Sequence, residues 1–252
     1  LGNELHLEFP ETYQNYYQYA KDHCDSAISG QGFNLSSSLD EWVSIFDADN
    51  GNNEEMIFEV QGSSISGQGT AVSNLFTPRN AGLSGSGFGG NNKLKPLFIN
   101  NMIDKFDNRY QNSIITQYET ATRQFNINPW STGYIPTNLE TGNTLGTLWQ
   151  VWTAKYIDTE ATTEYTSRQN WHIIRLADVY LMRAEASAEI LSDPSAANTD
   201  INLLRSRVEM NEIDYSSMSI EDFREEILRE RAVELYMEGH RFFDLTRFGV
   251  YD

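Results

Sequence analysis

Cysteines, basic residues and long apolar runs are all scarce in this chain of 252 residues. The lone cysteine, Cys24, excludes an internal disulfide and any metal site built from several cysteines, and its spacing with nearby alanines predicts a buried thiol. Lysine and arginine number 18 against 36 acidic residues, so the formal charge is −18. Without a basic cluster, binding to nucleic acid or to anionic headgroups is not expected. No apolar run reaches the length of about 20 residues that spans a bilayer.

Motifs for catalysis are missing as well. The sequence contains no His-Glu-x-x-His motif for zinc and no Gly-x-Ser-x-Gly nucleophile turn. Residues 85–90 imitate a Gly-x-Gly-x-x-Gly motif, but they do not join a strand to a helix, so a nucleotide role is not expected. With 36 carboxylates, pairs at any spacing are guaranteed and do not indicate glycoside hydrolysis. The sequence therefore predicts a protein that is not an enzyme and holds no cofactor.

Residues 47–55, Asp-Ala-Asp-Asn-Gly-Asn-Asn-Glu-Glu, are dense in the oxygen ligands that calcium prefers. An EF-hand loop needs glycine at its sixth position and glutamate at its twelfth, and these places are held by Asn52 and Phe58. We therefore expect a solvated turn here, with a calcium site as the alternative.

The pattern of apolar residues predicts a mainly helical fold with one long interruption. The interruption, residues 61–160, is an excursion of loops and short strands, and its first part, residues 61–95, holds eight glycines. Loops of that length in a compact domain are functional or disordered. Helices with short connections over residues 171–249 predict a tetratricopeptide-like layer. The expected elements are a helix over residues 10–30, a short helix or turn over 41–47, a strand over Met56–Val60, a helix over 97–106, and helices over 171–191, 196–210 and 219–237.

Residues 227–249 combine an amphipathic helix with an unusual density of charge. One interpretation is an acid/base or metal site built from Glu230, Glu234, Glu238 and His240, but the spacing matches no metal-binding template. The interpretation that we favour is a buried ion-pair network, because an arginine placed among leucines needs a specific buried partner. The network residues are Arg231, Arg241 and Arg247, paired with Glu234, Glu238 and Asp244.

The charged segment also has a recognisable order of motifs: Glu-Arg, then Glu-Leu, Glu-Gly-x-Arg and Asp-Leu-x-Arg. Other stretches accompany it in a fixed order. They are Trp42-Val-Ser-Ile-Phe46, Glu55-Met-Ile-Phe-Glu59, Asp107-Asn-Arg109-Tyr110, Lys155-Tyr156, Ile174-Arg-Leu-Ala-Asp-Val-Tyr-Leu-Met-Arg-Ala-Glu-Ala186 and Ile201-Asn-Leu-Leu-Arg-Ser-Arg207. Together, over roughly residues 12 to 249, these motifs resemble those of the SusD/RagB family. That family consists of nutrient-binding lipoproteins on the outer surface of Bacteroidetes.

The resemblance implies a mainly α, SusD-like fold and places residues 1–252 in a single SusD-like domain. Compared with the family pattern, an N-terminal half and a C-terminal tail are missing, so we expect the chain to be a fragment of a longer protein. By resemblance, that protein is a lipoprotein of the outer membrane, exposed at the cell surface through an N-terminal lipid anchor that is not in this chain. By the same resemblance, it binds an oligosaccharide without altering it chemically and delivers it to its partner, a SusC-like TonB-dependent transporter.

The resemblance also places ligand binding on the loops of the excursion, where glycan-binding relatives set aromatic rings against sugars and use amide and charged side chains on the hydroxyls. Here the glycine-rich loop has phenylalanines where a tryptophan or tyrosine platform is expected. Either Trp130 and Tyr134 supply the platform, or the ligand is not a starch-like glycan. Trp149 and Trp152 are expected in the core. The candidate ligand-binding residues are Phe76, Phe88, Trp130, Tyr134, Arg79, Asn80, Asn91 and Asn92.

A second hypothesis is a helical-repeat scaffold that binds protein and no glycan. The two hypotheses differ in whether Trp130 and Tyr134 are exposed together on one concave face.

Overall fold

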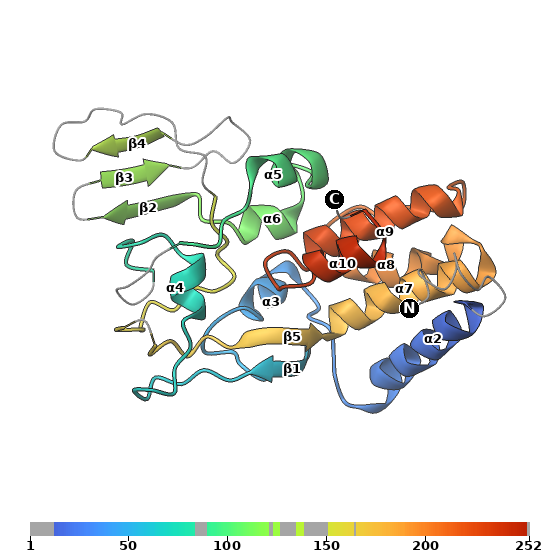
Figure 1. Ribbon diagram of the computed structural model, residues 1–252, viewed down its shortest axis with the longest axis horizontal. Coiled ribbons are helices and arrows are strands. Elements are labelled where there is room, and N and C mark those ends of the chain that lie inside the picture. Colours follow the sequence, from blue (N-terminus) through green and yellow to red (C-terminus); the bar gives the residue numbers. More distant parts are fainter. Residues whose placement is uncertain are drawn as a thin grey trace. The chain divides into compact units, whose positions relative to one another are not determined.

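The computed structural model describes residues 13–83, 90–120, 123–126, 135–138, 151–163 and 165–250, and of 123–126 and 135–138 it describes the backbone (Figure 1). The chain folds as two compact units. The first, which we call the helical unit, comprises Leu1–Leu39, Glu54–Phe58 and His172–Asp252. The second, the loop unit, comprises Asp40–Asn53 and Glu59–Trp171. That all 252 residues form one domain stays a prediction.

The helical unit is organised around α7 (Leu176–Leu191), which packs against α2 (Tyr13–Gly30), α8 (Asn198–Ser206) and α9 (Ile220–Glu234). Small residues recur on α7 at helical spacing and let its neighbours approach closely. A short 3-10 turn, η1 (Pro194–Ala197), joins α7 to α8, and α10 (Arg241–Arg247) follows α9. The core of this layer consists of Ala177, Leu181, Ala184, Ala188, Ala197, Ile201, Leu204, Tyr215, Phe223, Ile227 and Leu235.

The predicted boundaries of these helices are confirmed where local chemistry sets them. The chain turns after α7 because Ser192 adopts a left-handed conformation and Pro194 follows, where an α-helix cannot continue. Ser219 caps α9, because its Oγ accepts a hydrogen bond from Asp222 N at 3.1 Å and donates one to the Asp222 carboxylate at 2.7 Å.

The first helix, α2, buries a narrow face against α7. Tyr17 and Cys24 are buried, and Cys24 packs with Leu176 on α7, which confirms the buried thiol. Tyr16 and Tyr19 are exposed. Four tyrosines in seven residues offer several apolar faces, and the position of α7 selects the face that is buried.

Two strands lie beside each other in a small sheet, β1 (Met56–Val60) and β5 (Trp171–Arg175). The strand β1 was predicted, whereas β5 was predicted as the start of a helix. Its backbone is extended because it pairs with β1, more than 100 residues earlier in the chain, and local periodicity carries no signal of so distant a partner. Figure 1 shows β5 running straight into α7.

The loop unit contains short elements, as predicted for the excursion. Its helices are α3 (Leu39–Ser44), α4 (Val72–Phe76), α5 (Pro96–Met102) and α6 (Asn108–Asn112). The expected single helix over residues 97–106 ends at Met102, and a turn follows it. Asp107 begins α6, because its carboxylate accepts a hydrogen bond from Arg109 N at 2.9 Å. An antiparallel sheet has the order β2 (Gln117–Thr120), β3 (Arg123–Asn126), β4 (Ile135–Asn138).

Aromatic residues fill the core of the loop unit. Trp42 is fully buried, contacts the Phe46 ring edge-on, and lies beneath the buried ammonium group of Lys155, which is 5.5 Å from its centroid. Tyr156, the next residue, packs with Phe76 and Trp171. Within the described residues, no helix is both long and apolar enough to cross a membrane.

Candidate ligand-binding surface

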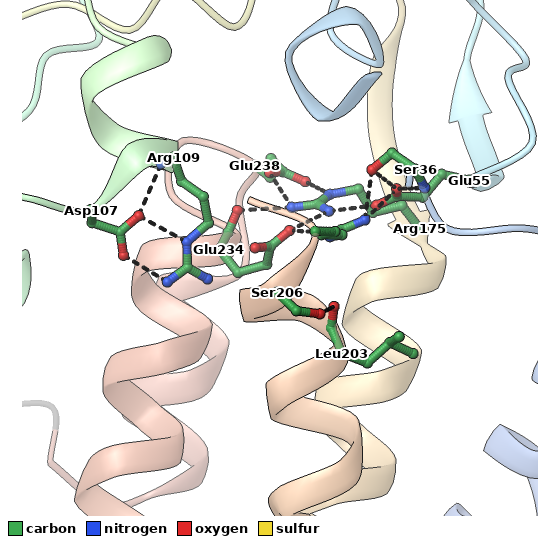
Figure 2. A network of polar contacts seen from close by, with 10 residues as sticks. Ser36, Glu55, Asp107, Arg109, Arg175, Leu203, Ser206, Glu234 and Glu238 are labelled. Carbon is green, nitrogen blue, oxygen red and sulfur yellow. Dashed lines mark hydrogen bonds and ion pairs between the residues drawn. The ribbon is translucent and has the colours of Figure 1, made fainter. Parts of the chain in front are cut away.

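The charged C-terminal helix takes part in a buried cluster centred on Arg175, the last residue of β5 (Figure 2). The Arg175 guanidinium donates to both oxygens of Glu238 (2.7 and 3.0 Å), to Glu55 (2.8 Å) and to Glu234 (2.8 Å), and also to the Glu234 carbonyl (2.8 Å). All five guanidinium N–H groups are thereby matched. Figure 2 shows these carboxylates gathered around the Arg175 side chain.

A second guanidinium completes the cluster from α8's end. Arg207 donates to Glu55 at 2.6 Å, to Glu234 at 2.6 Å and to the hydroxyl of Ser36 at 2.9 Å. Burial alone would raise the pKa of Glu55, but the facing Arg207 and Arg175 charges outweigh it and hold that pKa below its ordinary value. Likewise burial would lower the pKa of Arg175, and the three carboxylates raise it well above the usual range. The Glu55 carboxylate and the Arg175 guanidinium therefore both keep their charges at neutral pH.

A second buried group of charges joins α7, α9 and α10. Arg231 donates to Asp178 and to Asp244, each at 2.8 Å. Arg247 lies 3.3 Å from Asp244 and also pairs with Glu185. Burial would lower the pKa of Arg231, but the Asp178 and Asp244 carboxylates raise it. These bonds fix α10 against the rest of the helical layer.

The structure places Glu234 and Glu238 in the Arg175 cluster. It places Arg231, Asp244 and Arg247 in the second cluster. Arg241 is half-buried and donates to the carbonyl of Leu228 at 3.1 Å, and burial lowers its pKa. The sequence reasoning missed Arg175, Glu55 and Arg207, although all three lie in the matched motifs. The available signal was a mostly apolar stretch, Trp-His-Ile-Ile, that ends in an arginine.

Within the described part of the chain, no group of three or more His, Cys, Asp or Glu side chains is arranged to hold a metal ion. His240 Nδ1 is 3.9 Å from an oxygen of Asp178, and Glu230 pairs with Arg205 at 3.0 Å. The carboxylates are occupied by guanidinium groups, which is the pattern of a structural network.

Residues 47–53 of the acidic loop form a turn whose side chains bond to nearby groups of the loop unit. Asn50 and Asn53 donate side-chain hydrogen bonds to nearby backbone carbonyls, and Asn52 adopts a left-handed conformation. Asp49 pairs with Arg168 at 2.5 Å. The amides and one carboxylate are therefore used within the loop unit, as expected for a turn.

The glycine-rich segment, residues 77–92, leaves the fold at the short helix α4 and returns to the same helix. Thr77 follows α4 directly, and on the return Gly90 N donates to Asn74 O at 3.0 Å and Asn92 N to Leu75 O at 2.9 Å. Gly90 has a φ of +65°, and a Cβ there would lie 2.3 Å from Trp152 Nε1, so only glycine fits. The two described ends of the segment, residues 77–83 and 90–92, are thereby held near α4, and we call them the outgoing and the returning stem.

The stems carry the polar residues that the sequence singled out. Arg79 and Asn80 are exposed on the outgoing stem, and Asn80 adopts a left-handed conformation that asparagine tolerates. Asn91 is exposed and Asn92 half-buried on the returning stem. The structure therefore brings the backbone of all four residues to the neighbourhood of α4.

Of the four predicted aromatic contacts, the structure describes Phe76. Phe76 is 5% exposed, and its ring stacks on Trp171 and packs against Tyr156, so in this structure it serves the core and offers no free face to a sugar. We leave it out of the ligand surface. Trp152 is buried, as expected, and donates to Gly90 O. Three further predicted contacts, Phe88, Trp130 and Tyr134, and also Trp149, lie outside the described residues.

Comparisons with known proteins agree with one another. A model of the SusD family matches residues 8–252. The SusD-like protein P25 of Formosa agariphila is 36% identical over 96 residues, which are 37% of this chain and 18% of that protein. The chain is also similar to the structure of a laminarin-binding SusD-like protein, with 23% identity, a TM-score of 0.65, and coverage of 98% of this chain and 53% of the other.

Two further structures extend the likeness. A SusD superfamily protein from Parabacteroides distasonis has 21% identity and a TM-score of 0.71 over 93% of this chain and 47% of its own. Surface glycan-binding protein A from Bacteroides thetaiotaomicron, in complex with laminarihexaose, has 20% identity and a TM-score of 0.63 over 94% of this chain and 51% of its own. The chain spans about half the length of these solved relatives. The predicted fold, a mainly helical tetratricopeptide-like layer with an excursion, is confirmed.

Proposed function

This chain belongs to the SusD family, and on that premise we propose that it binds an oligosaccharide at the cell surface and delivers it, chemically unchanged, to a SusC-like TonB-dependent transporter. In this proposal the protein is a lipoprotein of the outer membrane, and binding is its whole role. Support for a glycan ligand comes from the relatives that bind laminarin and laminarihexaose.

The observation that carries the proposal is the pair of stems at α4. Arg79 and Asn80 on one stem and Asn91 and Asn92 on the other present donors and acceptors from an anchored backbone. Hydroxyl groups of a sugar need such paired donors and acceptors, and amide side chains supply both. Because the stems are bonded to α4, little backbone entropy is lost on binding.

The test is calorimetric titration of the chain with a panel of oligosaccharides, starting with laminarihexaose and with maltohexaose as a different linkage. The double variant Arg79→Ala with Asn91→Ala is expected to weaken binding at least about tenfold, which corresponds to 1.4 kcal/mol. Arg229→Ala, which removes an exposed arginine of α9 in the helical unit, is the matched control and should leave affinity unchanged. Unchanged affinity in the double variant would remove the stems from the site.

Two further measurements test the rest of the proposal. Incubation with laminarin should release no reducing sugar, since the proposed role is binding without hydrolysis. The protein, expressed together with a SusC-like TonB-dependent transporter, should co-purify with that transporter from outer membranes. Reducing-sugar release would contradict the first expectation, and separate elution would contradict the second.

The scaffold hypothesis has one observation in its favour. An open groove of about 630 Å³ runs along α8 in the helical unit. Asn202 fixes one wall by exchanging two hydrogen bonds of 2.9 Å with the backbone of Ile213, and Glu212 and Asp214 make that wall acidic. A chain that is folded yet binds no sugar across the panel would favour the scaffold.

A further inference from the structure

The groove along α8 belongs to the helical unit, whereas the stems proposed for sugar binding belong to the loop unit. One side of the groove is a single face of α8, formed at helical spacing by Thr199, Asn202, Leu203 and Ser206. Leu203 and Ser206 lie one turn apart on this helix (Figure 2). The other side is the segment of residues 212–214, which follows α8 in the chain. The groove therefore lies between a helix face and an irregular strip of backbone.

Two asparagine side chains of α8 hold this strip of backbone in place. The Asn202 amide donates to Ile213 O and accepts from Ile213 N, both at 2.9 Å, as a neighbouring strand would do. One turn earlier on α8, Asn198 Oδ1 accepts a hydrogen bond from Tyr215 N at 3.1 Å. The strip is thereby fixed before any ligand arrives, so that binding does not have to order it.

The backbone groups on either side of Ile213 are available to a ligand. Ile213 uses both its N–H and its C=O on Asn202. Among the residues that the structure describes, no hydrogen bond joins the backbone N–H or C=O of Glu212 or Asp214 to another group. Both residues are exposed. Alternate residues with available backbone groups are what a sheet edge offers when it takes up an added strand, so the main chain of a second polypeptide can pair here.

The groove is acidic, and no basic residue lines it. Its lining includes Glu212 and Asp214 but no lysine, arginine or histidine. Glu212 makes no ion pair with any part of the chain that the structure describes. Asp214 accepts hydrogen bonds from neutral groups of Ser216 and Asn198, and these bonds hold the pKa of its carboxyl below the ordinary value. Both carboxylates therefore face the groove without a compensating cation, which favours a positively charged ligand.

An exposed leucine adds an apolar contact to the helix side of the groove. Leu203 is 42% exposed on the lining face of α8, and a ligand that covers it removes apolar surface from water. The helix has nine residues and is therefore about 13 Å long. An extended peptide advances about 3.3 Å per residue, so about four of its residues match the length of the helix.

We propose that this groove is a docking site for an extended, lysine- or arginine-bearing segment of a partner protein. The main chain of that segment pairs with the backbone groups of Glu212 and Asp214, and its cations face the two carboxylates. An apolar side chain of the segment covers Leu203. A polypeptide fits better than a small cation, because a small cation would use the carboxylates and leave the backbone groups and Leu203 unused. This surface is separate from the proposed sugar site and does not depend on the proposed function.

The test measures fluorescence anisotropy of the labelled heptapeptide Lys-Thr-Lys-Val-Lys-Thr-Lys during titration with the 252-residue chain. The wild type should bind it saturably with a Kd below about 1 mM, and a peptide with glutamate in place of each lysine should not bind. Glu212→Lys should weaken binding at least about fivefold, because it places a like charge in the groove. The matched control is Glu225→Lys, which changes the net charge equally at an exposed residue of α9 that does not line the groove. It should bind as the wild type does.

The pairing of main chains is tested with two N-methylated forms of the same peptide. One carries the methyl groups on the lysine nitrogens and the other on the threonine and valine nitrogens. Because a strand added to an edge directs only alternate N–H groups toward it, one form should lose binding and the other should keep it. Leu203→Ala should weaken binding about threefold, since it removes the apolar contact.

Several outcomes would overturn the docking site. They are the absence of saturable binding by the wild type, equal binding by Glu212→Lys and Glu225→Lys, and full binding by both methylated peptides. Displacement of the peptide by spermidine or by calcium at an equal concentration of charge would show that the groove takes cations in general, and it would overturn the site as well. Melting curves matched to the wild type show that a loss of binding is local. A folded chain that binds the peptide but no sugar would leave this site standing while the proposed function fails.

Discussion

The buried Arg175 cluster yields the sharpest prediction about stability. Replacing Arg175 with methionine keeps much of the side-chain volume but leaves Glu55, Glu234 and Glu238 facing one another with fewer positive charges. Removing one partner from a buried ion pair costs about 3–5 kcal/mol. For a chain of this length we expect the melting temperature to fall by roughly 6–20 °C.

The measurement is urea and thermal unfolding followed by far-UV circular dichroism, with Arg229→Met as the control. Arg229 pairs with Glu226 at 3.3 Å on the surface of α9, with 48% of its side chain exposed. Exposed pairs contribute about 0–1 kcal/mol, so this variant should unfold close to the wild type. Arg175→Lys keeps the charge without the planar fork and should fall between the two.

The pH dependence gives an independent check with a definite sign. Because the arginines lower the pKa of Glu55 in the folded state, its ion pairs stabilise the wild type above the unfolded carboxyl pKa, and this stability is lost as the pH falls through the lower folded value. In Arg175→Met the buried carboxylates take up protons more readily, so protonation relieves their repulsion. The difference between variant and wild type should therefore shrink as the pH falls from 7 towards about 5. A variant that unfolds like Arg229→Met at pH 7 would refute the reasoning.

Four smaller predictions follow from other sites. Arg241→Ala should lower the melting temperature by less than Arg175→Met does, because Arg241 is half-buried whereas Arg175 is fully buried; an equal loss would contradict this ranking. Burial raises the pKa of Cys24 to about 11, so a thiol reagent at pH 8 should react slowly with the native chain and rapidly in urea; fast labelling of the native chain would argue against burial. Gly90→Ala should disturb the returning stem and weaken sugar binding, and wild-type affinity would show that the stem adapts. Ser219→Ala should destabilise α9 by about 1 kcal/mol, measured by urea unfolding, and no change would mean that the cap is dispensable.

The sequence predicted best what nearby residues decide. The break at Pro194 and the cap at Ser219 depend on residues within one helical turn, and both are present in the structure. The strand β1 was also predicted correctly, because its five residues form a short apolar run between polar loops.

What the sequence could not supply is the identity of distant partners. The strand β5 depends on β1, and Arg175 depends on Glu55, which lies 120 residues earlier in the chain. Charges in the C-terminal helix were paired with each other because sequence neighbours are the only partners that a pattern offers. Exposure is equally non-local: Phe76 is buried and Tyr165 exposed because of segments far from both in sequence.

The anchoring of the glycine-rich segment at α4 has a practical consequence. Since Asn74 and Gly90 are held one hydrogen bond apart, the chain between them starts and finishes at nearly the same point in space. Lengthening such a closed segment is inexpensive, because each doubling of its length costs only about 0.6 kcal/mol of closure entropy. The segment is thus a ready insertion point for protein engineering: a randomised peptide library, or a reporter domain whose fluorescence follows ligand binding, can be placed there while the anchored stems keep the rest of the fold intact.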